Sequence, residues 1–265
     1  MSRSSSSPST DPPGGAAQNG SVQIAPGLHR LGNGSINAYL VADGSEVTIV
    51  DAGLPGYWGD LPAELAAMGR TLDDVRAMVL THGHSDHVGF AERFRTERRI
   101  VPRIHELDAA MARGEVKPQH QQSGKTRIGS IVGFMLFGLR NGALRPKPLV
   151  EVATFGDGAT LDVPGAPRVI HVPGHSPGSA ALQFAGVDAL LLGDAFATRA
   201  VTNGYVGPVI APFSSDPAEA LVSLARLEGI EARWALPGHG APWTSGLPAA
   251  VEAVRARVAA GIPVG

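Results

Sequence analysis

The 265-residue chain contains no cysteine. This absence excludes disulfide bonds, thiolate metal ligands and cysteine nucleophiles, and it leaves the redox compartment open. Charge is also scarce, because charged residues make up 17% of the chain and the formal net charge is −2. Such a balance lacks the field that attracts nucleic acid or an anionic membrane. We therefore expect no nucleic-acid partner.

The first twenty residues lack the apolar core of roughly 7–15 residues that a secretory signal needs. They are mainly Ser, Pro, Gly and Ala, which predicts a disordered tail over residues 1–20. Without such a signal, a cytoplasmic location is the default expectation. The remaining chain is long enough for one large domain or two small ones, and we expect a single folded domain over residues 21–265.

Short β-branched or alternating runs between Gly and Pro predict strands, and runs with apolar residues three or four apart predict helices. Strands are expected at 22–31, 36–42, 46–50, 75–80, 100–104, 149–153, 159–163, 169–172, 180–184, 189–192 and 234–236. Helices are expected at 61–69, 88–98, 106–113, 216–228 and 247–260. Asp216 has the residue type of an N-cap, followed by Pro217 at the first helical position. The turns between the later strands favour antiparallel pairing.

A helical insert is predicted at about residues 114–148. Within it, residues 128–139 carry no charge and are apolar on all sides of a helix. This run is shorter than the roughly 20 residues that cross a bilayer, so we expect no stable membrane insertion. The simplest interpretation is a helix that packs over the fold and is buried on most sides. The alternatives are a wall of the substrate pocket and a membrane or dimer contact.

The densest chemistry lies between Thr81 and His87, in the sequence THGHSDH, directly after an apolar run. Three histidines and one aspartate within six residues indicate a metal site rather than a solvated loop. His82 and His84 point the same way if the loop is extended. Asp86 continues that side, whereas His87 points elsewhere. This offset suits two metal ions a few ångströms apart better than one.

Three later residues share a local pattern, since each follows an apolar strand in a turn that contains glycine. They are His175 in PGHSPG, Asp194 in LLGD and His239 in LPGHG. Glycine lets the backbone come close and frees the neighbouring side chain to aim at a point. Strand ends that converge at one edge of a sheet would support such a point rigidly.

The complete pattern resembles the metallo-β-lactamase superfamily over residues 22–260, and Ile49-Val50-Asp51-Ala52-Gly53 fits the first motif of that family. The resemblance implies an α/β fold, namely an αββα sandwich of two mixed sheets flanked by helices, with the active site at the sheet edge. It implies that Asp51 supports the site by hydrogen bonds without binding metal. It also implies a ligand set: His82, His84 and His175 for one ion, Asp86, His87 and His239 for the other, and Asp194 bridging both.

Five imidazoles, two carboxylates and no thiolate favour two Zn²⁺ ions, with iron or manganese as alternatives. A hydroxide bridging two divalent ions provides a nucleophile near neutral pH. Asp86 is the expected catalytic residue, which would orient the hydroxide and carry a proton to the leaving group. The reaction class is hydrolysis of an ester, thioester, lactone, amide or phosphoester.

Differences between this sequence and individual members of the family narrow the range of expected reactions. Two β-lactamase subclasses use cysteine at the position of Asp194, and the third lacks a bridging aspartate, so we do not expect a β-lactamase. Glyoxalase II has the same ligand set, but residues 240–265 are too few for its glutathione-binding helices. Acyl-homoserine lactonases often carry a tyrosine at the position of Ala197, for which Tyr205 is a candidate substitute.

The candidate substrate contacts are Trp58, Phe196 and Tyr205. With the apolar insert, they favour a small, partly apolar substrate and a lactonase-like or glyoxalase II-like (thio)esterase over a phosphodiesterase. The rival from another class is a mononuclear iron oxidoreductase of the persulfide dioxygenase kind, and a non-catalytic scaffold is a third alternative. An oligomer could form through residues 128–139. His29, His120 and His171 are read as structural or surface residues. His105 lies on a strand-to-helix turn near the site, but no motif position claims it as a ligand.

Overall fold

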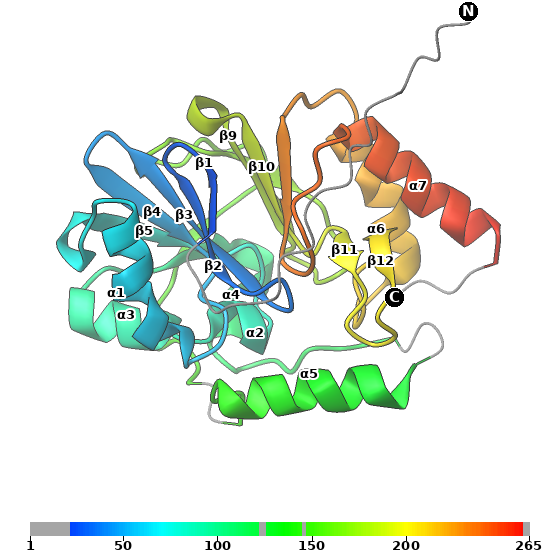
Figure 1. The fold of residues 1–265 in the computed structure, drawn as a ribbon, viewed down its shortest axis with the longest axis horizontal. Helices are drawn as coiled ribbons and strands as arrows, with labels where there is room; N and C mark the ends of the chain where they lie inside the picture. Colours follow the sequence, from blue (N-terminus) through cyan, green and yellow to red (C-terminus); the bar gives the residue numbers. More distant parts are fainter. Residues whose placement is uncertain (1–21, 122–125, 145–146, 262–265) are drawn as a thin grey trace, which may run out of the picture.

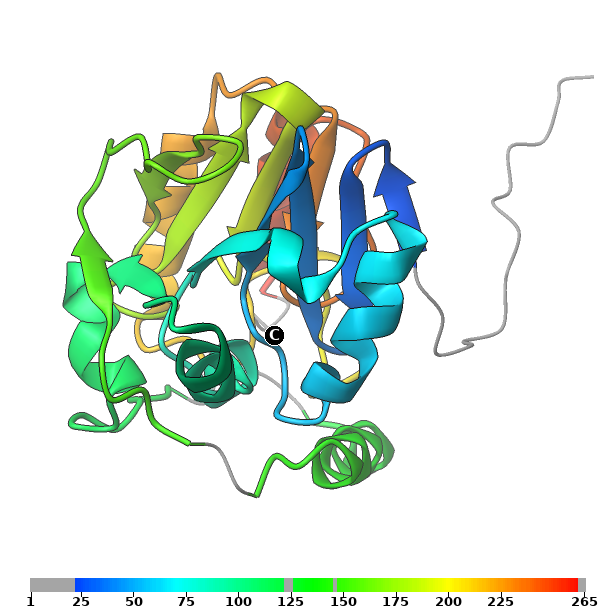
Figure 2. The ribbon, with the colours of Figure 1, turned by 90° about the vertical axis from the view of Figure 1, so that its left-hand side faces the viewer.

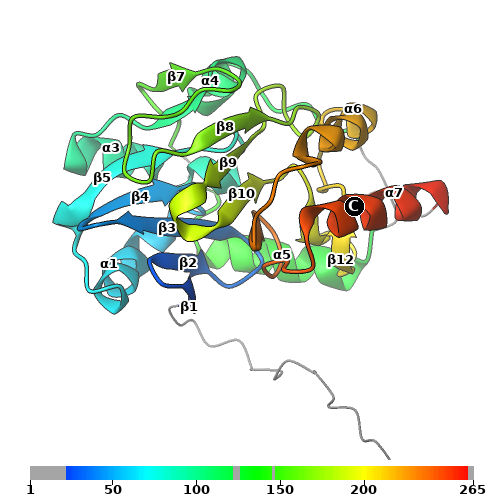
Figure 3. The ribbon, with the colours of Figure 1, turned by 90° about the horizontal axis from the view of Figure 1, so that it is seen from above.

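Two mixed β-sheets pack face to face, and helices cover the outer face of each sheet (Figure 1). The computed structural model describes residues 22–121, 126–144 and 147–261, so the tail predicted over residues 1–20 lies outside the described residues. From above, the layers follow one another as α1 (Tyr57–Ala67) and α3 (Ala91–Arg98), the two sheets, and then α6 (Pro217–Ser223) and α7 (Leu247–Ala259) (Figure 3). This order confirms the expected αββα sandwich.

The first sheet holds its seven strands in sequence order. They are β1 (Val22–Ala25), β2 (Leu28–Gly32), β3 (Asn37–Asp43), β4 (Glu46–Val50), β5 (Val75–Val79), β6 (Arg103–His105) and β7 (Ala153–Phe155). Strands β1 to β4 are antiparallel neighbours, whereas β4 to β7 pair in parallel. Parallel neighbours need long crossovers. The crossover connections between β4 and β7 contain α1, α3, η1 (Leu72–Asp74), α2 (Ser85–Val88), η2 (Glu106–Asp108), α4 (Ala109–Ala112) and α5 (Ile128–Arg140).

The second sheet has the strand order β13, β10, β9, β8. Its strands are β8 (Arg168–His171), β9 (Ala180–Phe184), β10 (Ala189–Gly193) and β13 (Trp234–Pro237). The first three are antiparallel, as expected, and β13 pairs in parallel with β10. A small sheet of β11 (Ala197–Arg199) and β12 (Val206–Val209) has no counterpart in the expected strands. Two 3-10 turns, η3 (Ala185–Val187) and η4 (Leu224–Leu227), complete this half.

Alternating side chains on each strand divide the apolar core into layers. On β10, Ala189 and Leu191 pack between the two sheets, in one cluster with Val41. Leu190 and Leu192 point the other way, into the cluster beneath α6 and α7. A third cluster lies between the first sheet and helices α1 and α3. Strands buried on both faces hold their ends firmly, and the candidate metal ligands follow those ends.

Some expected elements differ from the structure. The helix expected at 88–98 is broken at Gly89, whose N–H donates to the carbonyl of Gly53 and so leaves the helical pattern. The strand expected at 149–153 is displaced to β7 and joins the first sheet. Residues 159–163 form no strand and make only one bridge, at Thr160.

The largest departure is α5, which was expected to be buried on most sides. Gly138 is its only buried residue, and Ile128 is 82% exposed. Figure 1 shows α5 along one side of the molecule, and Figure 2 shows it end-on outside the layers. Among the described residues, no helix is long and apolar enough to cross a membrane.

Candidate metal centre

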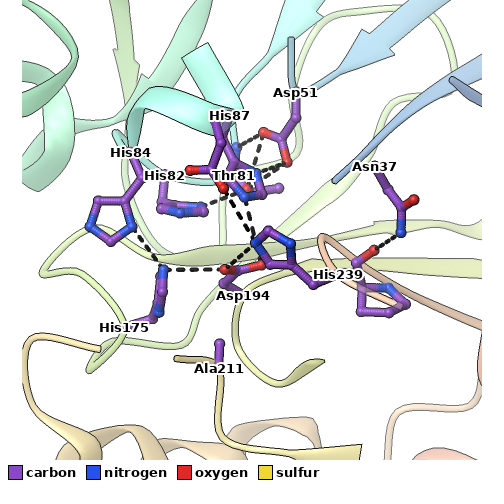
Figure 4. Close-up of polar contacts among 12 residues, drawn as sticks. Asn37, Asp51, Thr81, His82, His84, His87, His175, Asp194, Ala211 and His239 are labelled. Atoms are coloured by element: carbon purple, nitrogen blue, oxygen red, sulfur yellow. Dashed lines mark hydrogen bonds and ion pairs between the residues drawn. The ribbon is translucent and has the colours of Figure 1, made fainter. Parts of the chain in front are cut away.

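The candidate ligands follow the ends of four different strands. His82, His84, Asp86 and His87 come after β5, and the other three positions follow β8, β10 and β13. Both sheets present these strand ends at the same edge, so side chains far apart in the sequence converge (Figure 4). The structure thus brings together all seven residues that the sequence pattern assigns to the metals: His82, His84, Asp86, His87, His175, Asp194 and His239.

Their ligand atoms fall into three groups, and within each group the atoms lie within 4.8 Å of one another. Asp194 lies between the imidazoles of His175 and His239, since its Oδ2 is 3.3 Å and 3.2 Å from their Nε2 atoms. Its Oδ1 is 3.7 Å from Nε2 of His87. Asp86 completes the arrangement, with Oδ2 3.4 Å from Nε2 of His239. The three groups are His82, His84, His175; His82, His87, Asp194; and Asp86, His87, His239.

Four of the imidazoles have an oxygen partner for Nδ1. His87 Nδ1 lies 2.8 Å from Asp51 Oδ2, and His82 Nδ1 lies 3.1 Å from the hydroxyl of Thr81. On the other side of the site, His175 Nδ1 lies 3.2 Å from Oγ of Ser214, and His239 Nδ1 contacts the carbonyl of Ser35. An N–H donated from Nδ1 leaves the Nε2 lone pair free, which is how metal-binding histidines are oriented.

His84 is turned the other way. Its Nδ1 faces the group, 2.9 Å from Nε2 of His175, so these two ring nitrogens point at the same space. Its Nε2 is buried without a hydrogen-bond partner.

Buried polar atoms without partners test whether the site fits a metal ion. Nε2 of His82, Nε2 of His87 and Oδ1 of Asp194 are all buried and form no hydrogen bond. Leaving such atoms unpaired costs about 1–3 kcal/mol each, so native proteins seldom do so without a ligand. All three face into the groups described above, and the donor set of imidazole and carboxylate suits zinc or iron. The residues present therefore fit the metal.

The electrostatics of the cluster separate its histidines into two kinds. Burial lowers the pKa of His82 and His175 well below the ordinary value, which keeps both imidazoles neutral. Burial acts the same way on His87, but Asp51 and Asp194 outweigh it and raise its pKa to about 10. His239 behaves likewise, with a pKa of about 9. Metal binding at the latter two must displace a proton.

Asp51 connects the first sheet to the site. Its carboxylate accepts hydrogen bonds from the backbone N–H of Thr81 at 2.7 Å, from the Thr81 hydroxyl and from His87. Asp51 has φ 62°, a conformation that is uncommon for residues other than glycine and that persists only when its surroundings impose it. These hydrogen bonds place Asp51 behind Thr81 and His87, and the supporting role that the resemblance implies for it stays a prediction.

Asp108 is a residue of the site that the sequence analysis missed. It is fully buried and lies at the end of η2. One carboxylate oxygen accepts from the N–H of Gly83 at 2.8 Å and from the hydroxyl of Ser176 at 2.6 Å, and the other accepts from the N–H of Gly178 at 2.6 Å. Gly83 lies between two candidate ligands and Ser176 follows a third. Asp108 thus ties together the two loops that present them.

The loop that carries His239 is fastened to the first sheet. The side-chain amide of Asn37 donates to the carbonyls of Pro237 and Gly240, both at 2.9 Å, and the hydroxyl of Tyr39 donates to Pro237 at 2.7 Å. Gly238 approaches the cluster so closely that a Cβ there would collide with Asp194 Oδ1.

A cavity of about 390 Å³ opens onto the cluster. Phe134, Met135 and Leu139 of α5 line it, so the interpretation of the insert as a pocket wall holds. Its other lining residues include Ile36, Leu54, His120, Val201 and Phe213.

None of the three expected substrate contacts is among the described residues that line this cavity. Trp58 is 8% exposed and packs against Phe90 in the core, and Phe196 is fully buried beneath α6 and α7. The ring of Tyr205 is covered by the guanidinium of Arg257, 3.7 Å from its centroid. Aromatic residues near a motif in the sequence were a poor guide, because their side chains point into the core.

The remaining histidines are structural or exposed, as expected of His29, His120 and His171. His29 pairs with Glu64 in the interior, and His105 stacks on His171 with ring centroids 4.4 Å apart, so these three are structural. His120 is not. It lines the cavity, with its ring centroid 5.3 Å from that of His84, and its Nδ1 lies 2.8 Å from the Phe213 carbonyl.

Comparisons with known proteins agree with this geometry. Residues 31–239 match the family model of the metallo-beta-lactamase superfamily. The chain is 26% identical to the probable metallo-hydrolase YflN of Bacillus subtilis over 240 residues, which cover 84% of this chain and 87% of that protein. It is 29% identical to the uncharacterized YobT of the same organism, over 62% of this chain and 63% of that protein.

Solved structures are also similar. The metallo-beta-lactamase family protein TTHA1429 from Thermus thermophilus superposes with a TM-score of 0.67 at 27% identity, covering 90% of this chain and 81% of that one. TTHA1623 in a di-iron-bound form has a TM-score of 0.57 at 27% identity, with 84% and 95% of the two chains covered.

Proposed function

The chain belongs to the metallo-beta-lactamase superfamily, and from that premise we propose that it is a hydrolase with a two-ion metal site. The observation that carries the proposal is the overlap of the three ligand groups. His82 and His87 each belong to two groups, so a single ion would leave part of the set unused.

The proposed assignment places His82, His84 and His175 around one ion. Asp86, His87 and His239 surround the other, and Asp194 reaches both. Support for the bridging role comes from the position of Asp194 between the imidazoles of His175 and His239 (Figure 4).

We propose zinc as the metal, because the donors are nitrogen and oxygen and the chain holds no cysteine. Iron is the alternative, favoured by the di-iron form of TTHA1623. Two divalent ions supply Lewis acidity and lower the pKa of water toward neutrality.

Asp86 is the proposed proton carrier. Its side chain is 23% exposed, in contrast to the buried imidazoles around it, and it lines the cavity. A carboxylate at the boundary between cluster and cavity can hold a proton beside the leaving group and release it to solvent.

The lining of the cavity supports a carbonyl substrate with an apolar portion. Among the described residues that form it, no lysine or arginine is present, so it lacks the guanidinium and ammonium groups that commonly pair with a phosphate. Leu54, Phe134 and Phe213 offer apolar surface to an acyl chain. We therefore propose an ester, lactone or thioester as substrate.

The test is a panel of lactones, thioesters, carboxylic esters, phosphodiesters and β-lactams, assayed on protein of measured metal content. We expect about two zinc ions per chain and cleavage of the carbonyl substrates. Asp86→Ala should lower kcat/KM by roughly a hundredfold or more, whereas the exposed Asp162→Ala should not change it. Cleavage of phosphodiesters alone, or one iron per chain with oxygen consumption, would overturn the proposal.

A further inference from the structure

The outward face of α5 is an apolar stripe. Its members recur every three or four residues, which places them on one side of a helix. Their exposed fractions are 82% for Ile128, 47% for Val132, 59% for Met135, 50% for Leu136 and 46% for Leu139. A surface helix ordinarily carries polar residues on this side, so the stripe lacks the partner that its composition requires.

The opposite face of α5 is already used. Ile131, Phe134 and Phe137 are half-buried and Gly138 is buried against the fold. The helix is therefore apolar on both faces, and only one of them is covered by this chain.

Positive charge is concentrated in the segment of the chain that contains the stripe. Residues 116–150 contain six basic and no acidic residues, whereas the rest of the chain has 16 basic and 24 acidic residues. The near-neutral total thus conceals a basic segment. Arg127 and Arg140, at the two ends of α5, are exposed, as are Lys117 and Lys147. None of these four forms an ion pair within the described part of the chain.

We propose that α5 docks the protein on an anionic lipid surface, lying in the plane of the interface with its apolar stripe among the acyl chains. An apolar helical face bordered by cations has the chemistry of an interfacial helix. With its 13 residues, α5 is too short to cross a bilayer, so the contact is peripheral.

Two other partners could cover the apolar stripe of α5, but both fit it less well. The N-terminal residues 1–20 contain no Leu, Ile, Val, Phe, Tyr or Trp, so that segment cannot supply an apolar cover. A second copy related by two-fold symmetry would bring α5 against α5. The basic segment of one copy would then face the basic segment of the other, and like charges disfavour that contact.

The cavity makes the docking useful. Phe134, Met135 and Leu139 line it, and the last two also belong to the exposed stripe. A bilayer in contact with α5 would therefore lie beside the cavity mouth, from which an apolar substrate could enter. Vesicle binding can be measured without any reaction, so this proposal stands or falls independently of the hydrolase proposal.

The experiment is co-sedimentation with vesicles of phosphatidylcholine alone or of phosphatidylcholine mixed equally with phosphatidylglycerol. We expect the full-length protein to bind the mixed vesicles and to be released by salt. The variant Ile128→Ser/Val132→Ser/Leu136→Ser, which leaves the cavity-lining residues intact, should reduce partitioning by roughly a hundredfold. Its matched control is Val206→Ser/Val222→Ser, at valines that are 74% and 73% exposed elsewhere.

A second pair of variants tests the charge. Arg127→Gln/Arg140→Gln should reduce binding to the mixed vesicles by roughly tenfold or more, and the exposed Arg168→Gln/Arg233→Gln should not. Light scattering after gel filtration measures the oligomeric state of each protein. Failure of the natural sequence to bind the mixed vesicles would overturn the proposal, as would equal binding to both vesicle types. A dimer that the serine variant dissociates would assign the stripe to a second copy instead.

Discussion

The metal cluster and helix α5 satisfy their side chains in opposite ways. In the cluster, the imidazoles of His82, His87, His175 and His239 are each held from behind by an oxygen of this same chain. In α5, the side chains of the apolar stripe are between 46% and 82% exposed. The side chains of the cluster are held by contacts within this chain, whereas the outward face of α5 is exposed and available to a partner outside the chain. Substitutions should therefore act on metal and fold in the first region, and on access and docking in the second.

Removing a ligand from the cluster gives the largest expected effect. Asp194→Ala takes away the carboxylate that lies between the two imidazole groups and leaves those imidazoles facing one another unshielded. We expect metal affinity and activity to fall by more than the roughly 10–100-fold typical of an outer partner. Metal analysis after dialysis and a kinetic assay measure both. Asp188→Asn, at the opposite end of the same strand, is the control, and equal retention of metal by the two variants would contradict the assignment.

Weakening the support behind a ligand gives a smaller effect. Asp51→Asn keeps the size of the side chain and tolerates the positive φ, but it replaces one acceptor with an amide that cannot accept from His87 or Thr81. We expect a roughly 10–100-fold loss of metal affinity, measured by competition with a chelator. The exposed Asp73→Asn should bind metal as the natural sequence does. An unchanged affinity for Asp51→Asn would remove the supporting role.

Asp108→Asn tests the residue that joins the two ligand loops. The amide can face only some of its three donors as an acceptor, so at least one of the N–H or O–H groups of Gly83, Ser176 and Gly178 loses its bond. We expect the free energy of unfolding to fall by about 1–3 kcal/mol, with a parallel loss of metal affinity. Denaturant titration measures the first. A variant with normal stability and normal affinity would show that other contacts hold the loops.

The metal ligands and Asp108 show what the sequence could and could not predict. The four candidate ligands after β5 were predictable because they cluster within six residues, and the three later ones because each follows an apolar strand in a turn that contains glycine. Both signals are local, and the resemblance to the family gave each residue its role. Asp108 gives no such signal, since an aspartate in a strand-to-helix turn looks the same as an ordinary cap. Its partners Gly83 and Gly178 lie 25 and 70 residues away in the sequence. The layers of the fold were predictable for the same reason as the ligands, because apolar alternation marks each strand.

The error over α5 has a different cause. A run that is apolar on all sides requires cover on all sides, and from sequence the cover was assigned to the rest of the fold. Composition states that the face needs a partner but carries no information on whether the partner belongs to the same chain.

The pH dependence of the free energy of unfolding of the metal-free protein distinguishes the metal cluster from α5. His87 has a folded pKa of about 10, above its ordinary 6.5, so its contribution to stability is complete below pH 6.5 and is lost as pH rises toward 10. His239 acts in the same direction, with a folded pKa of about 9. Each pKa unit corresponds to about 1.4 kcal/mol for each group, so we expect the free energy of unfolding to fall by roughly 3–6 kcal/mol between pH 7 and pH 10. In Asp51→Asn the decline should be smaller, and an equal decline would show that the Asp51 carboxylate is not its source.

The smallest effect on the free energy of unfolding is expected for substitutions on the outward face of α5. It gives the clearest contrast with substitutions beside the metal cluster. Leu136→Ala removes a side chain that is 50% exposed and touches no core cluster, so the free energy of unfolding should change by less than about 0.5 kcal/mol. Leu80→Ala, at a fully buried leucine just before the metal-site histidines, should cost about 2–5 kcal/mol. Thermal or denaturant unfolding of both variants measures the difference. If Leu136→Ala cost as much as Leu80→Ala, the stripe would already be covered in solution, and α5 would belong to the organised interior after all.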